Sequence, residues 1–143
     1  MDEKLLEKIV VTPLKRIPTS GGDVLKFLTK KDGNFYGFGE AYFSIVLPGA
    51  VKAWKCHKEM TLNLVVPVGE IRFVFYEEIK GNKYFRVEEL GIDSYARLTV
   101  PPGIWFGFKG IATEPSLLLN ISDILHDPLE CDRCDQSTIL FNW

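Results

Sequence analysis

Polar and apolar residues alternate along most of this chain with a period of about two, which is the period of β-strands rather than of α-helices. Only the segment Met1 to Ile9 has a spacing that favours helix, for about two turns. The runs that we predict as strands are 23–29, 40–47, 51–56, 61–68, 70–78, 83–90, 96–100, 103–112, 115–121 and 137–143. The pattern therefore predicts an all-β protein with a short N-terminal helix or arm.

Turn-forming residues separate these runs. Clusters rich in Gly, Pro, Asn and Asp recur roughly every ten residues, as expected of an all-β sandwich or barrel. The clusters are 20–22, 31–34, 48–49, 81–82, 91, 101–103 and 127–128. Pro67 lies inside a predicted strand, where it removes a backbone donor, so we expect a sheet edge or a bulge there.

Length and charge narrow the class of protein. With no internal repeat and no linker-like stretch, residues 1–143 are expected to form a single domain. The 17 basic and 19 acidic side chains leave a formal charge of −2, which gives no attraction to nucleic acid or to anionic lipid. The N-terminus lacks the basic start of a signal peptide, and no apolar run is long enough to span a membrane. We therefore expect a cytoplasmic protein without nucleic-acid or membrane partners.

The segment 51–58 carries polar residues where a strand should face the interior. If it is extended, Lys55 and His57 share one face with the small residue Ala53, while Lys52 and Trp54 share the other. Two polar side chains beside a small apolar one suggest that this face points into a cavity. We therefore take Lys55 and His57 as candidate catalytic residues.

Cysteine and histidine counts argue against a metal centre. Cys131 and Cys134 have the spacing of half a zinc site, but the chain has no second pair. A metal site built from three histidines is excluded as well, because His57 and His126 are the only two here. The three cysteines are expected to be reduced, and we expect neither a metal nor another cofactor.

Four motifs, in order, resemble the dTDP-4-dehydrorhamnose 3,5-epimerase family, a group of RmlC-like cupins. They are PLKRIPTSGGDVLKF, GEAYFSIVLPGAVKAWKCHKEMTLNLVVPVGEIRFVFYEE, LGIDSYARLTVPPGIWFGF and LLLNISDILHDPLECDR. The resemblance covers about Pro13 to Trp143. It implies a cupin jelly roll, two antiparallel sheets around a cavity, in a homodimer that exchanges N-terminal strands. It also implies a metal-free reaction on a nucleotide-linked 4-keto sugar. In this reaction a histidine base removes the proton beside the ketone, a cation stabilises the enolate, and a tyrosine acid returns a proton.

The base position of the resemblance is changed in this chain. The family pattern of Arg-Gly-Leu-His falls on Lys52-Ala53-Trp54-Lys55, so Lys55 stands where the base is expected, with His57 as the nearest imidazole. A buried lysine can serve as a base when desolvation lowers its pKa, and a charged lysine can bind a phosphate or ketone oxygen. Lys52 and Trp54 of the same motif are expected to contact substrate. A solvated or salt-bridged strand residue is the alternative for Lys55.

Other reaction positions are also replaced. The enolate-stabilising lysine falls near Asn63, and the tyrosine acid falls beside Asp123, where only a shift of one residue brings His126 in as a substitute. Asp135 is the candidate partner of the base. Phe106 replaces the histidine of the Pro-Pro-Gly-x-x-His-Gly-Phe motif and is expected to line the substrate site, with plain core packing as the alternative. The family's N-terminal Arg-Gly becomes Gly21-Gly22.

Two aromatic residues complete the expected substrate site. Most aromatics in a small barrel belong to the core, but Tyr76 and Trp105 are our candidates for stacking on a nucleotide base at the cavity mouth. Two functions stay open at this point. One is a metal-independent epimerase or isomerase of a nucleotide-linked 4-keto deoxysugar. The other is a non-catalytic cupin that binds a sugar nucleotide as a scaffold or regulator in polysaccharide biosynthesis.

Overall fold

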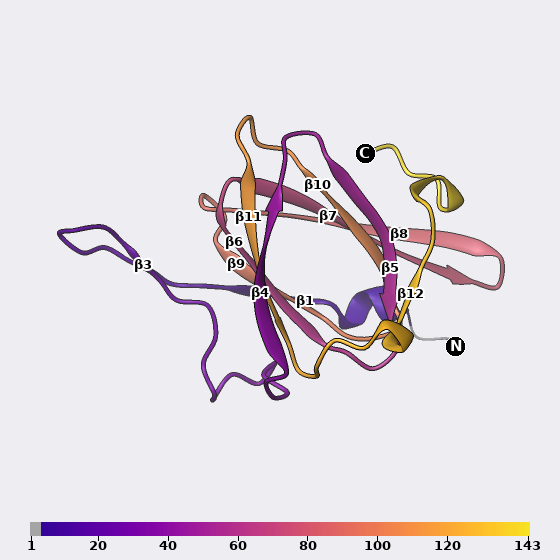
Figure 1. The fold of residues 1–143 in the computed structure, drawn as a ribbon, viewed down its shortest axis with the longest axis horizontal. Coiled ribbons are helices and arrows are strands. Elements are labelled where there is room, and N and C mark those ends of the chain that lie inside the picture. The colour runs from indigo at the N-terminus through magenta and orange to yellow at the C-terminus, as the bar shows by residue number, and fades with distance from the viewer. Residues whose placement is uncertain (1–3) are drawn as a thin grey trace.

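Two antiparallel sheets face each other in the computed structural model, which describes residues 4–143 (Figure 1). The first sheet has the order β1 (Val10–Pro13), β9 (Ala96–Val100), β6 (Leu62–Val68), β11 (Ser116–Ser122) and β4 (Glu40–Val46). The second sheet has the order β12 (Cys131–Arg133), β5 (Val51–His57), β10 (Trp105–Gly110), β7 (Glu70–Ile79) and β8 (Asn82–Gly91). This arrangement confirms the predicted all-β jelly roll.

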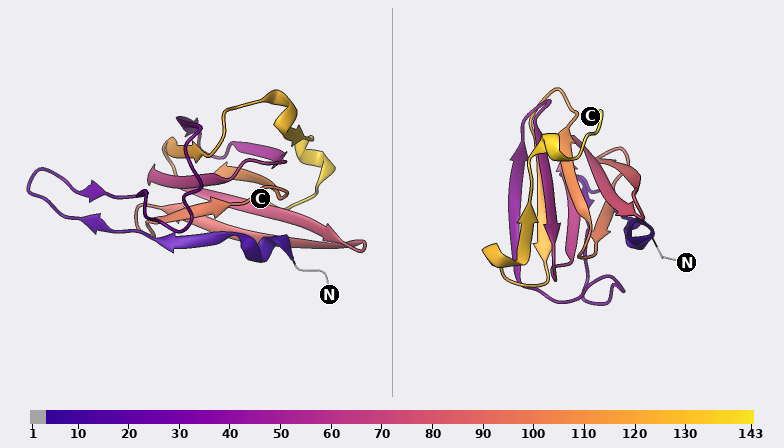
Figure 2. Two further views of the ribbon diagram at one scale, coloured as in Figure 1. Left: turned by 90° about the horizontal axis from the view of Figure 1, so that it is seen from below. Right: turned by 90° about the vertical axis from the view of Figure 1, so that its right-hand side faces the viewer.

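Three short 3₁₀ helices and one hairpin lie outside the two sheets. The helices are η1 (Leu5–Lys8), η2 (Pro128–Glu130) and η3 (Gln136–Thr138). The hairpin pairs β2 (Arg16–Ile17) with β3 (Val24–Leu25) and projects away from the body of the protein (Figures 1 and 2). Within residues 4–143, no helix is long and apolar enough to cross a membrane.

The core lies between the sheets because strand alternation directs one face of each strand inward. Along β11, for example, every second residue from Ser116 to Ser122 is buried, and the residues between them are half-buried on the outer face. The largest core side chains come from both sheets, among them Phe73, Phe75 and Leu98, which are almost completely buried. The bulge expected at Pro67 is confirmed, since the pairing of β6 with β11 shifts register there.

Several expected elements differ from the structure. The N-terminal segment forms a single 3₁₀ turn, at Leu5–Lys8, and residues 1–3 of the predicted helix lie outside the described part of the chain. Only Val24–Leu25 of the predicted strand 23–29 is extended and paired. The pattern also failed to indicate the short strand β12, because three residues are too few to show a period.

The predicted strand 137–143 is wrong. Residues 136–138 form η3, and the rest of the segment is irregular. Two of its backbone carbonyls bond to a side chain instead of to a neighbouring strand. The indole nitrogen of Trp54 donates to the carbonyls of Gln136 and Ile139 at 3.2 and 3.1 Å. The apolar side chains of the segment, Phe141 and Trp143 included, then cover the outer face of the second sheet.

Candidate active site

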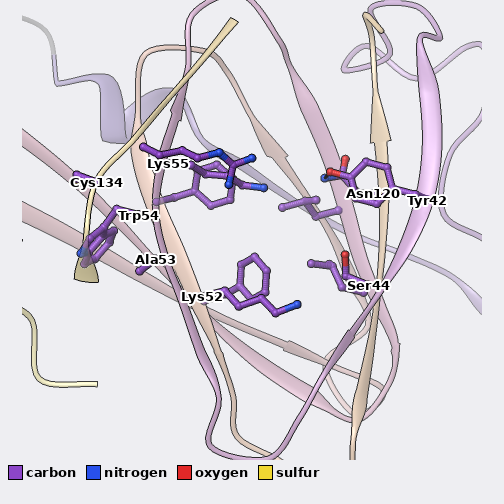
Figure 3. Close-up of a pocket in the computed structure, with 13 residues that line it drawn as sticks. Tyr42, Ser44, Lys52, Ala53, Trp54, Lys55, Asn120 and Cys134 are labelled. Carbon is purple, nitrogen blue, oxygen red and sulfur yellow. Dashed lines mark hydrogen bonds between the residues drawn. The ribbon is translucent and has the colours of Figure 1, made fainter. Parts of the chain in front are cut away.

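A cavity of about 420 Å³ opens between the two sheets. One wall is formed by β5, β10 and β12, and the opposite wall by β4, β11 and β6. Figure 3 shows Lys52 and Lys55 on the first wall and Tyr42, Ser44 and Asn120 on the second, across the open space. A cavity of this size is in the range of small-molecule sites.

The first wall is positively charged. Lys52 and Lys55 come from β5, and Arg133 comes from β12, where it pairs in register with Lys55. No Asp or Glu belongs to the lining among residues 4–143. Three cations without a carboxylate partner in the lining suit an anionic ligand.

Lys55 lies in an environment that disfavours its charged form. Its Nζ atom lies 5.3 Å from the ring centroid of Phe106, in cation–π range. Burial lowers the pKa of Lys55 from its ordinary value of 10.5, and the charges of Arg133 and Lys52 act in the same direction, against an opposing effect of Cys131. Lys55 therefore loses its proton at a lower pH than an exposed lysine does.

Lys52 and Lys55 share the cavity wall although strict alternation would place them on opposite faces. The pairing of β10 with β5 shifts register between Phe106 and Phe108, which interrupts the alternation. Gly107 lies at this point, and a Cβ atom built on it would come within 2.5 Å of the Ala53 Cβ. The close approach of the two backbones therefore requires glycine at position 107.

The second wall is polar but uncharged. Asn120 is 3% exposed, and its Nδ2 donates to the Tyr42 hydroxyl at 2.9 Å. The Oδ1 atom of Asn120 is buried and has no hydrogen-bond partner among the described residues. Burial raises the pKa of Tyr42 above its ordinary value of 10.0, and the charge of Glu40 adds to this, so the phenol keeps its proton at neutral pH.

His57 forms a buried pair with a carboxylate that the sequence did not single out. Its Nδ1 lies 2.6 Å from Oε1 of Glu130. The other carboxylate oxygen, Oε2, accepts the backbone N–H groups of Lys58, Glu59 and Met60 at 3.0, 3.0 and 3.1 Å. Burial alone would raise the pKa of Glu130, but these backbone bonds and the bond to His57 outweigh it and lower the pKa.

The surroundings of His57 favour its neutral imidazole. Burial lowers its pKa below 6.5 despite the opposing effect of Glu130. With Nδ1–H donating to the carboxylate, Nε2 carries the lone pair, and this atom is buried without a partner among residues 4–143. The ring centroid lies 6.2 Å from that of Phe106, which lines the cavity, whereas His57 itself is not part of the lining.

The other predicted substrate-binding residues separate into two groups. Trp54 and Phe106 border the cavity, although the ring of Trp54 points away from it in Figure 3. Asn63 is not part of the cavity lining, and its Oδ1 accepts a hydrogen bond from Nε of Arg97. Tyr76 and Trp105 pair in register and pack with the C-terminal segment, so neither belongs to the cavity lining.

The predicted acid and the predicted partner of the base lie apart from Lys55. His126 is exposed in the segment between β11 and η2 and is not part of the cavity lining. Asp135 is exposed at the N-terminus of η3 and borders a separate, shallow depression with Phe141. The structure therefore does not bring Lys55, His57, His126 and Asp135 together in one cavity.

Four residues of this region were missed by the sequence analysis. Tyr42 and Asn120 follow the inward period of β4 and β11 through Val46 and Leu118, so alternation carried a usable signal. Arg133 and Glu130 lie in and before a strand too short to show a period. Their roles depend on contacts with segments far away along the chain.

All three cysteines are free thiols. Cys134 lines the cavity, Cys131 is half-buried on β12, and Cys56 is buried on β5. Burial, with the nearby acidic groups of Asp132 and Cys131, raises the pKa of Cys56 to about 11. Among residues 4–143 no group of three or more His, Cys, Asp or Glu side chains is placed to hold a metal ion.

Comparison with known proteins shows which family this chain belongs to. A dTDP sugar isomerase from Desulfovibrio desulfuricans G20 shares 40% sequence identity, and the match covers 96% of this chain and 91% of that one with a TM-score of 0.88. The chain belongs to the RmlC-like dTDP-sugar epimerase and isomerase family. The resemblance inferred from the four motifs is thereby confirmed.

Other similar proteins are more distant. The sugar 3,4-ketoisomerase QdtA from Thermoanaerobacterium thermosaccharolyticum, solved with TDP, has 18% identity, covers 93% of this chain and 92% of that one, and has a TM-score of 0.74, which shows a shared fold. A Haloferax volcanii protein named "Probable low-salt glycan biosynthesis epimerase Agl13" is 32% identical over 91 residues, 61% of this chain and 58% of the relative's length. The spore coat polysaccharide biosynthesis protein SpsL of Bacillus subtilis strain 168 is 27% identical over 113 residues, 74% of this chain and 75% of SpsL. The chain matches no protein-family model.

Proposed function

We propose that this protein binds a nucleotide-linked 4-keto deoxysugar and moves a proton at the carbon beside its ketone, without a metal or other cofactor. The observation that carries the proposal is the cavity between the sheets, with cations on one wall and uncharged polar groups on the other. Removal of a proton beside a ketone needs a base, a cation near the developing enolate oxygen and a donor that returns the proton. Family membership supports the choice of substrate class.

The two exposed cations of the cavity wall bind different parts of the proposed substrate. Lys52 and Arg133 are both exposed at the cavity wall, where a diphosphate can reach them from solvent. Guanidinium groups bind phosphate oxygens through paired donors, and ammonium groups act as point charges. We assign Arg133 to the diphosphate and Lys52 to the enolate oxygen.

Lys55 is the proposed base. Its side chain faces the cavity, and burial lowers its pKa toward the range in which a neutral amine can accept a proton. His57 is the other candidate because its Nε2 has a free lone pair, but His57 is not part of the cavity lining. We therefore assign His57 and Glu130 to holding the end of β5, next to Lys55.

In the proposed reaction the neutral amine of Lys55 takes the proton from the carbon beside the ketone and becomes an ammonium. The electron pair of the broken C–H bond forms the enolate, whose oxygen is stabilised by Lys52. Protonation of the carbon then re-forms the ketone, and Lys55 returns its proton to solvent. The sum is an isomerisation, with no oxidant, reductant or co-reactant consumed.

Deuterium exchange tests this function directly. The protein is incubated in D₂O with dTDP-4-keto-6-deoxyglucose, the kind of ligand seen in a QdtA variant complex, and the sugar is followed by NMR and mass spectrometry. We expect deuterium at the carbons beside the ketone and formation of an isomeric product. A Lys55→Met variant should bind the nucleotide but fail to exchange. Wild-type protein that neither exchanges these protons nor forms product would overturn the proposed activity.

A non-catalytic sugar-nucleotide-binding protein is the second candidate function. It is favoured by the positions of His126 and Asp135, which lie outside the cavity lining and leave the expected acid and the partner of the base unfilled there. Calorimetry distinguishes the two candidates. Binding of dTDP by the wild type, reduced in an Arg133→Ala variant and without exchange of any related sugar, would select the binding function.

We further propose that the protein forms a homodimer through the outer face of the first sheet. Phe43 and Ile45 of the edge strand β4 are 64% and 65% exposed there, an apolar surface that a second copy would cover. The projecting β2–β3 hairpin offers a further contact (Figure 2). Light scattering after size exclusion at micromolar concentration should give twice the chain mass, and a Phe43→Asp/Ile45→Asp double variant should give the monomer. A wild-type monomer would contradict the proposal.

A further inference from the structure

We propose that Tyr42 is the catalytic acid of this site and that Asn120 is its positioning residue. The inference rests on the proposed proton transfer and adds a donor that neither the family motifs nor the sequence analysis assigned. The expected acid position, near Asp123, holds no tyrosine, and the substitute His126 lies outside the cavity lining. The polar wall opposite Lys55 supplies the missing group.

Position is the first argument. Tyr42 on β4 and Lys55 on β5 line opposite walls of one cavity, so a sugar ring between them presents one face to each (Figure 3). A base on one face and an acid on the other allow a carbon to lose its proton from one side and regain one from the opposite side. This is the geometry that inversion at the carbon requires.

The direction of the Tyr42 hydrogen bond is the second argument. The Nδ2 group of Asn120 donates to the phenol oxygen at 2.9 Å, so Tyr42 is the acceptor in this bond. Its own O–H proton is not used by Asn120 and is available to a ligand in the cavity. The N–H donor also stabilises the phenolate that forms when the proton leaves.

An unsatisfied atom on the same wall is the third argument. Asn120 is only 3% exposed, yet its Oδ1 has no hydrogen-bond partner among the described residues. A buried amide oxygen without a partner is costly, and a sugar hydroxyl in the cavity would satisfy it. Asn120 thus contacts both the ligand and the acid, and it fixes their relative position.

Electrostatics are consistent with this role. Burial and the charge of Glu40 raise the pKa of Tyr42, which keeps the phenol protonated and ready to donate, while Arg133 acts in the opposite direction and stabilises the phenolate. Tyr42 is 40% exposed, so the phenolate can regain a proton from water at the cavity mouth. In the step itself the enolate carbon forms a bond to the phenol hydrogen, the O–H bond breaks, and its electron pair stays on the phenolate oxygen.

Tyr42→Phe is the decisive variant because it removes only the hydroxyl. Lys55 still removes and returns a proton on its own face, so the variant should keep deuterium exchange beside the ketone. Formation of the inverted product should fall by about 10²–10⁴-fold, the usual contribution of a general acid. The matched control is Tyr36→Phe, at a tyrosine that is 62% exposed and outside the cavity lining, which should retain both activities.

Asn120→Leu tests the positioning role. The leucine cannot donate to Tyr42, so kcat for the inverted product should fall while exchange continues, and the alkaline limb of product formation should move to higher pH. A purely structural role would lower exchange and product formation together and leave the limb in place.

The outcomes separate this inference from the proposed function. A wild type that shows neither exchange nor product overturns the proposed function, and this assignment with it. A Tyr42→Phe variant that forms the inverted product at the wild-type rate overturns only the assignment of the acid. Loss of exchange together with product would also overturn it, because Tyr42 would then be needed for binding or for the base.

Discussion

Nδ1 of His57 and Oε1 of Glu130 lie 2.6 Å apart in a buried pair that joins the end of β5 to η2. The same carboxylate also accepts three successive backbone N–H groups, from Lys58 to Met60. One side chain therefore fixes the turn that follows β5. Because Lys55 precedes His57 by two residues, this pair holds the strand end that carries the proposed base.

Loss of the Glu130 carboxylate should destabilise the fold. In a Glu130→Gln variant an amide N–H₂ group replaces one of the two carboxylate oxygens that accept from His57 and the backbone. At least one buried donor then has no acceptor. We expect the free energy of unfolding to fall by about 1–3 kcal/mol. Urea denaturation measures this, with Glu89→Gln as the control at an exposed ion pair with Arg72. Equal losses in the two variants would contradict the role of Glu130.

Acid should weaken the same region. The pKa of His57 is lowered below 6.5 in the folded protein, so the unfolded chain takes up this proton first, and the stability that His57 contributes above pH 6.5 is lost as the pH falls through its folded-state pKa. Glu130, whose pKa is lowered below 4.5, adds a second loss further into acid. Thermal unfolding followed by circular dichroism should show Tm decreasing below pH 6.5. A His57→Gln variant should lack the first part of this decrease.

Lys55 and His57 predict different pH profiles for catalysis. If Lys55 is the base, its amine must be neutral, so exchange should rise as the pH increases toward a pKa below 10.5. Lys55→Arg keeps the charge but cannot supply a base, and exchange should fall about 10²–10⁴-fold while dTDP binding is retained. Lys83→Arg, at an exposed lysine of β8 outside the cavity lining, is the matched control and should still exchange. A profile that is flat above pH 6.5 and falls only in acid would assign the base to His57 instead.

Gly107 should tolerate no side chain. A Cβ atom there would meet the Ala53 Cβ at 2.5 Å, and the Lys52 carbonyl oxygen at 2.9 Å, so β10 and β5 would have to separate. We expect Gly107→Ala to destabilise the protein by about 1–3 kcal/mol. Gly33→Ala is the control because nothing lies within 4 Å of a Cβ at that position. A Gly107→Ala variant as stable as the control would show that the strands adjust freely.

Asn63 is expected to act in folding rather than in catalysis. Its Oδ1 accepts from Nε of Arg97 at 3.1 Å and from the Thr99 hydroxyl at 2.6 Å, and its Nδ2 donates to the Asn34 carbonyl. Asn63→Ala leaves buried donors unpaired, and we expect a loss of about 1–3 kcal/mol of stability. The exchange rate per folded molecule should not change. A selective loss of exchange would return Asn63 to the site.

The two-residue period was sufficient to predict an all-β protein, because it is continuous along most strands, β4 and β11 included. The jelly-roll arrangement was implied by the motif resemblance. The period was insufficient for the C-terminal segment, where Ile139 and Phe141 alternate like a strand but Trp54 takes the backbone carbonyl of Ile139. A local pattern cannot reveal this competition, since the two partners are 85 residues apart.

The same limit applies to the site. Motif comparison placed Lys52 and Lys55 near the chemistry, and both line the cavity. Alternation could have added Tyr42, but it does not say which strand lies across the cavity from β5. Glu130 carried no signal, because it ends a three-residue 3₁₀ helix too short to show a period and lies 73 residues from His57. Long-range pairs of this kind are visible only once the sheets are assembled.

The position of Cys134 in the cavity wall provides a built-in reporter. An alkylating reagent should modify this thiol, whereas Cys56, buried and with a pKa raised to about 11, should resist at neutral pH. An occupant between the sheets would shield Cys134 and slow its labelling. Mass-spectrometric footprinting of this one side chain could therefore screen a library of nucleotides and sugars for the natural occupant, even where no turnover assay exists.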